Sequence, residues 1–161
     1  MENSYFDPAF HTGFTNVHGF FEHAVKRYPH NIAIVFKEQI ISYIELNNKA
    51  ESLCRIILSR PAGSDIIGVS ATRSIGTIIA VIAILKAGKA YLPVDLSHPQ
   101  ERLLYLMRDA GLQLCICGEN ERKSFASAKI ELIIVNEKHD KTINNGYNSI
   151  INPPGISNSL A

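Results

Sequence analysis

The sequence predicts an α/β fold in which helices flank a layered, mostly parallel sheet. Strand-like and helix-like segments alternate between Ile66 and Val135, which is typical of parallel sheets with right-handed crossovers. The 161 residues are 46% hydrophobic and 19% charged, as in globular domains that bury a sizeable core. Residues that begin and end helices separate the apolar segments. The hydrophobic pattern and these helix start and end signals therefore predict the same fold class.

The N-terminal part is expected to contain a helix and a short hairpin. Residues 1–14 are polar, aromatic and irregular, and we interpret them as an approach segment. Asn16 can cap the helix that follows. Residues 31–36 have the β-branched enrichment of a strand, residues 37–39 predict a turn, and residues 40–41 predict a second strand. The predicted apolar face of the helix consists of Val17, Phe20, Phe21, Ala24 and Val25.

A second helix has a strong start signal. Ser42 and Glu45 have the spacing of a capping box, in which each side chain accepts a hydrogen bond from the backbone amide of the other. Ile41 before the cap and Leu46 after it are placed as a hydrophobic staple. Residues 61–63, Pro-Ala-Gly, are expected to end the element. The predicted buried face consists of Leu46, Ala50, Leu53, Cys54, Ile57 and Leu58.

The next helix has no polar face. Residues 66–70 form an apolar strand, and Ser74 can cap the helix after it. The run IIAVIAIL at residues 78–85 predicts a helix that is buried on all sides. Gly88 is expected to end this helix in the left-handed conformation.

A short strand and another helix follow at once. Residues 90–94 are rich in strand formers, but Pro93 lacks an amide donor, so the strand is expected at a sheet edge or to end there. Ser97, with Pro99 and Gln100 after it, predicts the start of the next helix, and Gly111 its end.

The last part of the sheet and a linker complete the chain. Residues 112–117 and 130–135 predict strands, with a short helix at residues 121–129 between them. Residues 137–161 are rich in Asn, Gly, Pro and Ser and predict a loop or disordered linker. The expected division is therefore an N-terminal segment at 1–14, an α/β fragment at 15–136 and this linker.

Two motifs carry a family resemblance. LKAGKAYLPVD at residues 85–95, followed by HPQERLLYLMRDAG at residues 98–111, resembles the second core motif of adenylation domains of nonribosomal peptide synthetases, in the adenylate-forming, AMP-dependent ligase superfamily. ISYIEL at residues 41–46 resembles the first core motif. Over residues 15–161, the resemblance implies a partial, N-terminal piece of the adenylate-forming ligase fold.

The resemblance also implies a chemistry. The family activates a carboxylic acid, usually an amino acid, with ATP and magnesium to form an acyl-adenylate, and then transfers the acyl group to a carrier thiol. The motifs that supply this chemistry lie beyond the region matched here, and residues 159–161 resemble the lead-in to the phosphate loop. No catalytic, cofactor-binding or metal-binding residue is therefore assigned, and this fragment is not expected to bind a cofactor.

Several residues have both a chemical and a structural interpretation. Asp95, Glu101 and Arg102 suggest acid–base chemistry, but Glu101 suits a helix start and Arg102 can pair locally or brace the junction, so we favour structural roles. Lys86 suits a helix C-terminus in the same way. Gly63, Gly68, Gly76 and Gly88 are too scattered for a nucleotide-binding loop, and we attribute them to turns, close packing or helix ends.

Cysteines and histidines show no metal-binding spacing. Cys115 and Cys117 lie on one face of a predicted strand, and we favour small core residues over a metal or redox pair. His18 and His23 are five residues apart, which does not align them on a helix, and His98 suits a turn.

The composition of the chain limits which partners and which compartment are expected. A net charge of +1 gives no electrostatic reason to expect nucleic acid or a membrane as a partner. A helix over residues 74–87 would span about 21 Å, less than the ~30 Å hydrocarbon core. The N-terminus does not resemble a signal peptide. Three cysteines without such a signal suggest reduced thiols in the cytoplasm.

Three hypotheses about function remain open. The first is a truncated or split adenylation domain that is inactive alone and needs the remaining part of the domain. The second is a stand-alone interaction or assembly module that pairs with another chain, or with itself, through exposed apolar surface. The third is a small nucleotide-binding α/β protein with its ligand beyond the strand C-termini.

Overall fold

The computed structural model describes residues 17–61, 63–135 and 149–150. The chain divides into two compact units, Met1–Lys49 and Ala50–Ala161, and each is described by itself. The boundaries expected near residues 14 and 136 lie outside the described residues, as does Asn16, the predicted cap of the first helix.

The first unit contains the predicted helix and hairpin. Helix α1 (Val17–Arg27) precedes strands β1 (Ile32–Phe36) and β2 (Gln39–Ser42), which pair antiparallel. The turn is shorter than expected: Gln39 already pairs with Phe36, and Lys37 adopts a positive φ of 53°. Val17 was expected on the buried face of α1 but is exposed, because it is the first residue of the helix.

The capping box at the start of α2 (Tyr43–Leu58) is confirmed. The Ser42 amide donates to Glu45 Oε2 at 2.9 Å, and the Glu45 amide donates to Ser42 Oγ at 3.4 Å. The predicted buried face of α2 is also confirmed, except at Leu58, which is exposed on the last turn.

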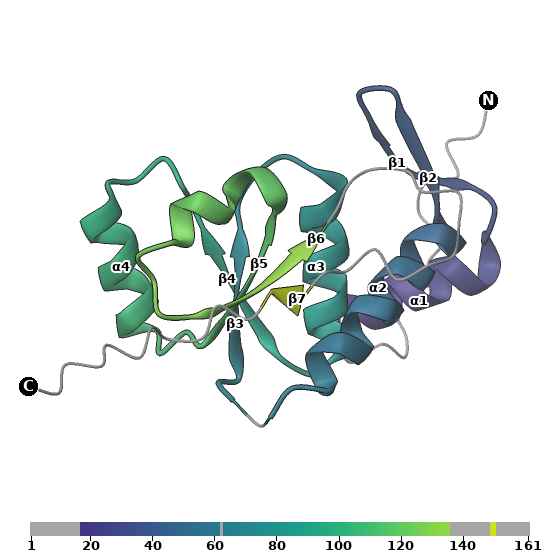
Figure 1. Ribbon diagram of the computed structural model, residues 1–161. Coiled ribbons are helices and arrows are strands. Elements are labelled where there is room, and N and C mark those ends of the chain that lie inside the picture. Colours follow the sequence, from purple (N-terminus) through teal and green to yellow (C-terminus); the bar gives the residue numbers. More distant parts are fainter. Residues whose placement is uncertain (1–16, 62, 136–148, 151–161) are drawn as a thin grey trace, which may run out of the picture. The chain divides into compact units, whose positions relative to one another are not determined.

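The second unit is built on a five-stranded sheet in the order β4-β3-β5-β6-β7 (Figure 1). The first four strands in this order are parallel, and the last pairs antiparallel with β6. The parallel α/β layer predicted from the sequence is thus confirmed. The short β7 was not expected, since it lies in the predicted linker. The strands are β3 (Ile66–Ser70), β4 (Ala90–Val94), β5 (Leu114–Gly118), β6 (Glu131–Val135) and β7 (Ser149–Ile150).

Helices cover the sheet on both faces. Helices α3 (Ile75–Lys86) and α4 (Gln100–Asp109) lie on opposite sides of it (Figure 1). The short helix predicted at residues 121–129 is instead the 3₁₀-helix η2 (Glu119–Phe125), which starts and ends earlier than expected. The apolar cluster that α4 and η2 form with one face of the sheet consists of Val94, Leu103, Met107, Leu112, Cys115, Cys117, Phe125, Leu132 and Ile134.

Helix α3 packs against β3, β4 and β5, but it is not buried on all sides as the sequence predicted. Ile79, Ala83 and Ile84 are buried, whereas Ile78 is 42% exposed and Leu85 is half-buried. The sheet covers one side of the helix, and an apolar sequence alone does not supply a layer for the other side.

Gly68 allows close packing at the centre of the sheet. It pairs in register with Cys115, and a Cβ atom at Gly68 would lie 2.9 Å from Cys115 Sγ and 3.1 Å from Leu112 Cδ1. Contacts that short require the neighbouring side chains to move. Of the roles considered for Gly68, close packing is the one found.

We expect Gly68→Ala to lower the free energy of unfolding by about 1–3 kcal/mol, because the added methyl group overpacks the cluster beside Cys115. Urea denaturation measures the loss. In the background of Cys115→Ala, which makes room at the same place, the added cost of Gly68→Ala should shrink by at least ~0.5 kcal/mol. Strict additivity of the two substitutions would contradict the proposed contact.

Candidate functional site

The junction that the sequence singled out begins where α3 ends. The Lys89 amide donates to the Ile84 carbonyl at 3.1 Å, and the Gly88 amide donates to the Leu85 carbonyl at 3.0 Å. These two bonds form a Schellman motif, which requires a left-handed residue. Gly88 supplies it with φ of +70°. The predicted left-handed helix end is confirmed, and it turns the chain directly into β4.

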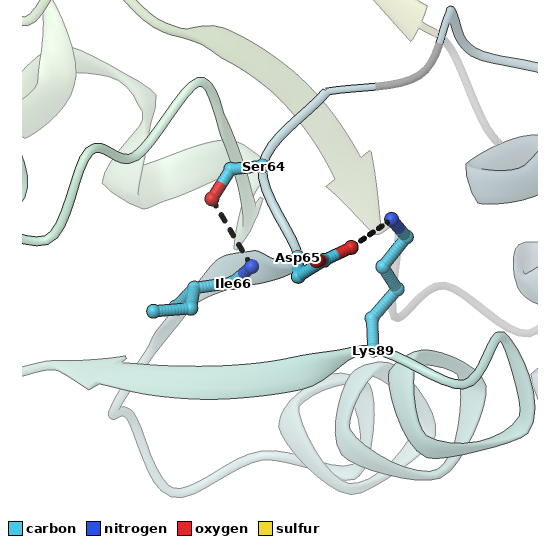
Figure 2. A network of polar contacts seen from close by, with 4 residues as sticks. All are labelled: Ser64, Asp65, Ile66 and Lys89. Carbon is cyan, nitrogen blue, oxygen red and sulfur yellow. Dashed lines mark hydrogen bonds and ion pairs between the residues drawn. The ribbon is translucent and has the colours of Figure 1, made fainter.

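An ion pair fixes the start of β4 beside β3. Lys89 Nζ lies 2.8 Å from Asp65 Oδ1 (Figure 2). The Ala90 amide donates to the Asp65 carbonyl, also at 2.8 Å. On the other side of Asp65, the Ile66 amide donates to Ser64 Oγ at 3.1 Å. The hydrogen bond and the charge of Lys89 hold the pKa of Asp65 below its usual value. This exposed pair aligns the parallel strands rather than forming a reactive centre.

A turn, not a helix cap, follows β4. The Ser97 amide donates to Asp95 Oδ1 at 2.9 Å, and this bond keeps the pKa of Asp95 below its usual value. Helix α4 starts only at Gln100, with Pro99 at the N-cap and no side-chain cap bond. The predicted start at Ser97 is therefore wrong, because Asp95 holds Ser97 in a turn first. His98 belongs to the same turn, as expected.

Asp95, Glu101 and Arg102 do not form an acid–base site. Asp95 is engaged by the turn, while Glu101 and Arg102 lie exposed on the first turn of α4. Within the described part of the chain, neither Glu101 nor Arg102 takes part in an ion pair. The local pairing expected for Arg102 is thus not found there. Lys86 lies in the last turn of α3, 3.7 Å from Glu51.

The cysteines are buried core residues. Cys115 and Cys117 belong to the cluster beneath α4, and Cys54 is buried on α2. Burial raises the pKa of Cys117 from 9.0 to about 12 and also raises the pKa of Cys115 and Cys54. All three are free thiols. Thiols that resist ionisation are poor nucleophiles and poor metal ligands, which agrees with the packing role inferred from the sequence.

The described residues do not provide a metal site. Among them, no three His, Cys, Asp or Glu side chains come together in a way that could hold an ion. His18 and His23 are half-buried on α1, and His98 is half-buried after β4. As for membranes, the helices within the described ranges are all too short or too polar to cross a bilayer.

Two ion pairs were not predicted from the sequence, because each joins residues that are far apart in the chain. Asp65 and Lys89 are 24 positions apart, so no local spacing pattern connects them. Likewise, Arg60 Nε lies 3.0 Å from Glu131 Oε1, which links the end of α2 to β6. A signal for either pair could have come only from knowing which strands are neighbours.

Comparison with known sequences identifies relatives. The family model described as AMP-binding enzyme matches residues 21–150. Tyrocidine synthase 1 of Brevibacillus parabrevis is 38% identical over 102 residues, which are 63% of this chain and 9% of that protein. Gramicidin S synthase 1 of Brevibacillus brevis is 38% identical over 101 residues, which are 62% of this chain and 9% of that protein. The chain thus spans a small part of these relatives.

Solved structures agree on the fold. The nonribosomal peptide synthetase FmoA3, in its alpha-methyl-L-serine-AMP bound form, superposes with a TM-score of 0.68 at 26% identity, over 73% of this chain and 14% of that chain. The N-terminal subdomain of NpsA from Klebsiella oxytoca gives a TM-score of 0.64 at 21% identity, over 74% of this chain and 30% of that chain. The latter likeness concerns the fold alone.

We expect Gly88→Ala to lower the free energy of unfolding by about 1–2 kcal/mol, because a Cβ atom is strained in the left-handed conformation. Apart from its chain neighbours, no heavy atom lies within 4 Å of where that Cβ would be, so crowding does not contribute. Gly88→Asn is the matched control and should cost less, since Asn tolerates this conformation better. Equal losses for Ala and Asn in urea denaturation would contradict this account.

We expect the three thiols to resist alkylation in the folded chain. At pH 8, a pKa of about 12 leaves Cys117 with roughly 1,000-fold less thiolate than an ordinary thiol. Mass spectrometry after iodoacetamide treatment should show labelling only once guanidinium unfolds the chain. Because the folded-state pKa is raised, stability should also fall as pH rises above 9, less so in Cys117→Ala. Rapid labelling of the native chain would contradict the burial.

Proposed function

The chain belongs to the AMP-binding enzyme family, and we propose that it is the N-terminal portion of an adenylation domain of nonribosomal peptide synthesis, without adenylating activity alone. The match of the family model over residues 21–150 is the observation that carries this proposal. The relatives are peptide synthetases, and one structural neighbour holds an aminoacyl-AMP. For the complete domain, we propose formation of an acyl-adenylate from a carboxylic acid and ATP, with release of pyrophosphate.

The described residues do not fit a Mg–ATP site of their own. In a doubly wound sheet, the ligand crevice lies beyond the strand C-termini where the strand order reverses, here between β3 and β5. The α3 N-terminus next to β3 is closed by its own bonds: the Thr77 amide donates to Ser74 Oγ, and Thr77 Oγ1 donates to the Thr72 carbonyl at 2.8 Å. The described residues also lack a three-ligand metal group. We therefore propose no cofactor for this chain alone.

The junction then has a structural role in the domain. Its polar groups hold turns and align strands: Lys89 pairs with Asp65, and Asp95 binds the Ser97 amide. These groups would keep β3, β4 and α4 in fixed positions. The three buried free thiols fit the cytoplasm, the compartment that we propose.

A specific observation favours the second candidate, an interaction module. Val35 and Ile40 face each other across the hairpin and are 64% and 55% exposed. An exposed apolar pair on a two-stranded hairpin is a surface that another chain, or a second copy, could cover. A concentration-dependent change in sedimentation that Val35→Ser abolishes would support this candidate over the first.

Amino-acid-dependent exchange of pyrophosphate into ATP tests the proposed function. We expect background exchange from the isolated chain with each common amino acid, because its described residues include no group of three side chains that could hold a metal ion, and the start of α3 is closed by its own hydrogen bonds. The same chain, grafted into the adenylation domain of tyrocidine synthase 1 in place of its 102 matched residues, should restore measurable exchange. The unaltered domain is the positive control.

Two outcomes would contradict the proposal. Robust exchange by the isolated chain would show that it is an enzyme in its own right. A graft that folds, as judged by circular dichroism, but shows no exchange would show that the chain cannot serve as this part of an adenylation domain. Heat released on titrating the isolated chain with ATP would instead favour a small nucleotide-binding protein.

A further inference from the structure

Strands β3 and β5 stop pairing before either strand ends. Their ladder runs no further than the pair Val69–Ile116. On its other side, β3 remains paired with β4 through Ser70, and β5 remains paired with β6 through Gly118. The ladder is therefore open between Ser70 and Gly118, and we call this place the ladder opening. It lies at the C-terminal edge of the sheet where the strand order reverses, which is the edge where doubly wound folds bind ligands.

The main-chain groups at the ladder opening have other partners. The Ala71 amide donates to the Val94 carbonyl on β4, so the alternation along a strand directs the main chain of Ser70 toward β5. The next bond of the ladder would therefore join the Gly118 amide to the Ser70 carbonyl. Instead, the Gly118 amide donates to Glu121 Oε2 at 2.9 Å. A side chain of η2 thus takes the place of a ladder bond.

The Ser70 hydroxyl is buried at the ladder opening without a hydrogen-bond partner. Ser70 is 2% exposed, and no atom of the described part of the chain bonds to its Oγ. Val94 pairs with Ser70 on β4, and Cys117 follows the last paired residue of β5, so two members of the apolar cluster flank this hydroxyl. A buried hydroxyl without a hydrogen bond destabilises a fold, and native structures rarely keep one.

Glu121 supplies a second polar group at the ladder opening. Besides the bond of its Oε2, a Cβ atom at Gly118 would lie 3.7 Å from Glu121 Oε1, so both carboxylate oxygens lie close to Gly118. The charge of Glu121 also reaches Cys117: burial and then this carboxylate raise the pKa of the Cys117 thiol. A carboxylate oxygen has two lone pairs, so Oε1 can accept a further hydrogen bond.

We propose that an ordered water molecule occupies the ladder opening, where it accepts a hydrogen bond from Ser70 Oγ and donates one to the Glu121 carboxylate. The Ser70 carbonyl can accept a further bond from this water. Thr77 Oγ1 lies 3.3 Å from that carbonyl oxygen but 2.8 Å from the carbonyl oxygen of Thr72, so its hydroxyl donates mainly to Thr72. Buried waters typically make about three hydrogen bonds, and three partners are in place here.

The surroundings of the ladder opening favour water over a charged ligand. Glu121 and its neighbour Glu119 carry negative charge, which repels phosphate and other anions. Within the described residues, no three His, Cys, Asp or Glu side chains come together to hold a metal ion. The burial of Ser70 leaves no access for a larger molecule. Water can both accept from a hydroxyl and donate to a carboxylate, which is what these two groups require.

The water would join β3 to η2 where the ladder lacks a bond. Ser70 is the last residue of β3, and Glu121 belongs to the segment that follows β5. The site does not depend on the adenylation role, because all of its groups belong to this chain.

Two structural measurements test the site directly. Magnetic relaxation dispersion of ¹⁷O-enriched water counts the long-lived water molecules of the full chain in solution. We expect Ser70→Ala to lower this count by one, because the water loses its donor. Ser59→Ala is the matched control: Ser59 is exposed and its Oγ donates to the Ile56 carbonyl, so the count should not change. A crystal structure should show a water within hydrogen-bond distance of both Ser70 Oγ and the Glu121 carboxylate.

Stability gives an independent readout. We expect Ser70→Ala to raise the equilibrium constant for unfolding roughly 2–10-fold in urea denaturation, because a hydroxyl bonded to buried water stabilises the fold like other hydrogen bonds. In the background of Glu121→Ala, this effect should shrink at least ~2-fold, since the bridge has lost its other end. Glu119→Ala is the matched background, because Glu119 lies on the same helix and pairs with Arg122 at 3.9 Å. There, Ser70→Ala should keep its full effect.

Four results would overturn the water site. They are an unchanged count of long-lived waters in Ser70→Ala, a lower unfolding constant in that variant, an equal effect of Ser70→Ala in the two glutamate backgrounds, and a crystal structure in which Ser70 Oγ bonds directly to a protein atom or a metal ion. A lower unfolding constant would mean that the hydroxyl is unpaired in the folded chain. The water count and the crystal structure of the unaltered chain decide the matter even if Glu121→Ala does not fold.

Discussion

The second unit depends on the position of β3 between two parallel neighbours. β3 pairs with β4 on one side and with β5 on the other, and the cluster beneath α4 forms only if β5 lies close to it. Gly68 makes that approach possible, because Cys115 Sγ occupies the space that a side chain at residue 68 would need. On the β4 side, the ladder pairs residues 66–70 with residues 90–94, and the exposed Lys89–Asp65 pair lies where this ladder starts. Strand alignment, helix packing and thiol burial all follow from this arrangement.

Features with a local cause could be predicted from the sequence, and features with a distant cause could not. Ser42, Ser74 and Gly88 act on backbone groups within five residues, so helix starts and ends were correct there. Ser97 was misread because two local motifs competed, and Asp95 engages its amide before a helix can begin. The exposure of Ile78 depends on which layers surround α3, and no pattern within α3 encodes that.

The chemical role of the candidate site was also difficult to predict from local sequence. The junction from α3 to α4 was recognisable as a family motif, and its residues proved to be held by turns and strand alignment. Acidic and basic side chains there gave a weak signal for catalysis, because helix ends and turns also favour them. Their surroundings separated the two interpretations: Asp95 is engaged by the Ser97 amide within a turn, and Glu101 and Arg102 lie exposed on the first turn of α4.

Pro93 makes one edge of the sheet less able than the other to pair with a further strand. Ala90 and Val94 direct backbone groups toward β3, through the Ala90 amide bonded to Asp65 and the Val94 carbonyl bonded to Ala71. Because strand residues alternate, Tyr91 and Pro93 direct theirs away from the sheet. Proline has no amide hydrogen there, so the outer edge of β4 is a poor template for a further strand. The sheet is thus protected against edge-to-edge pairing on the β4 side, and a further strand can be added more readily at the opposite end of the sheet, where β7 lies.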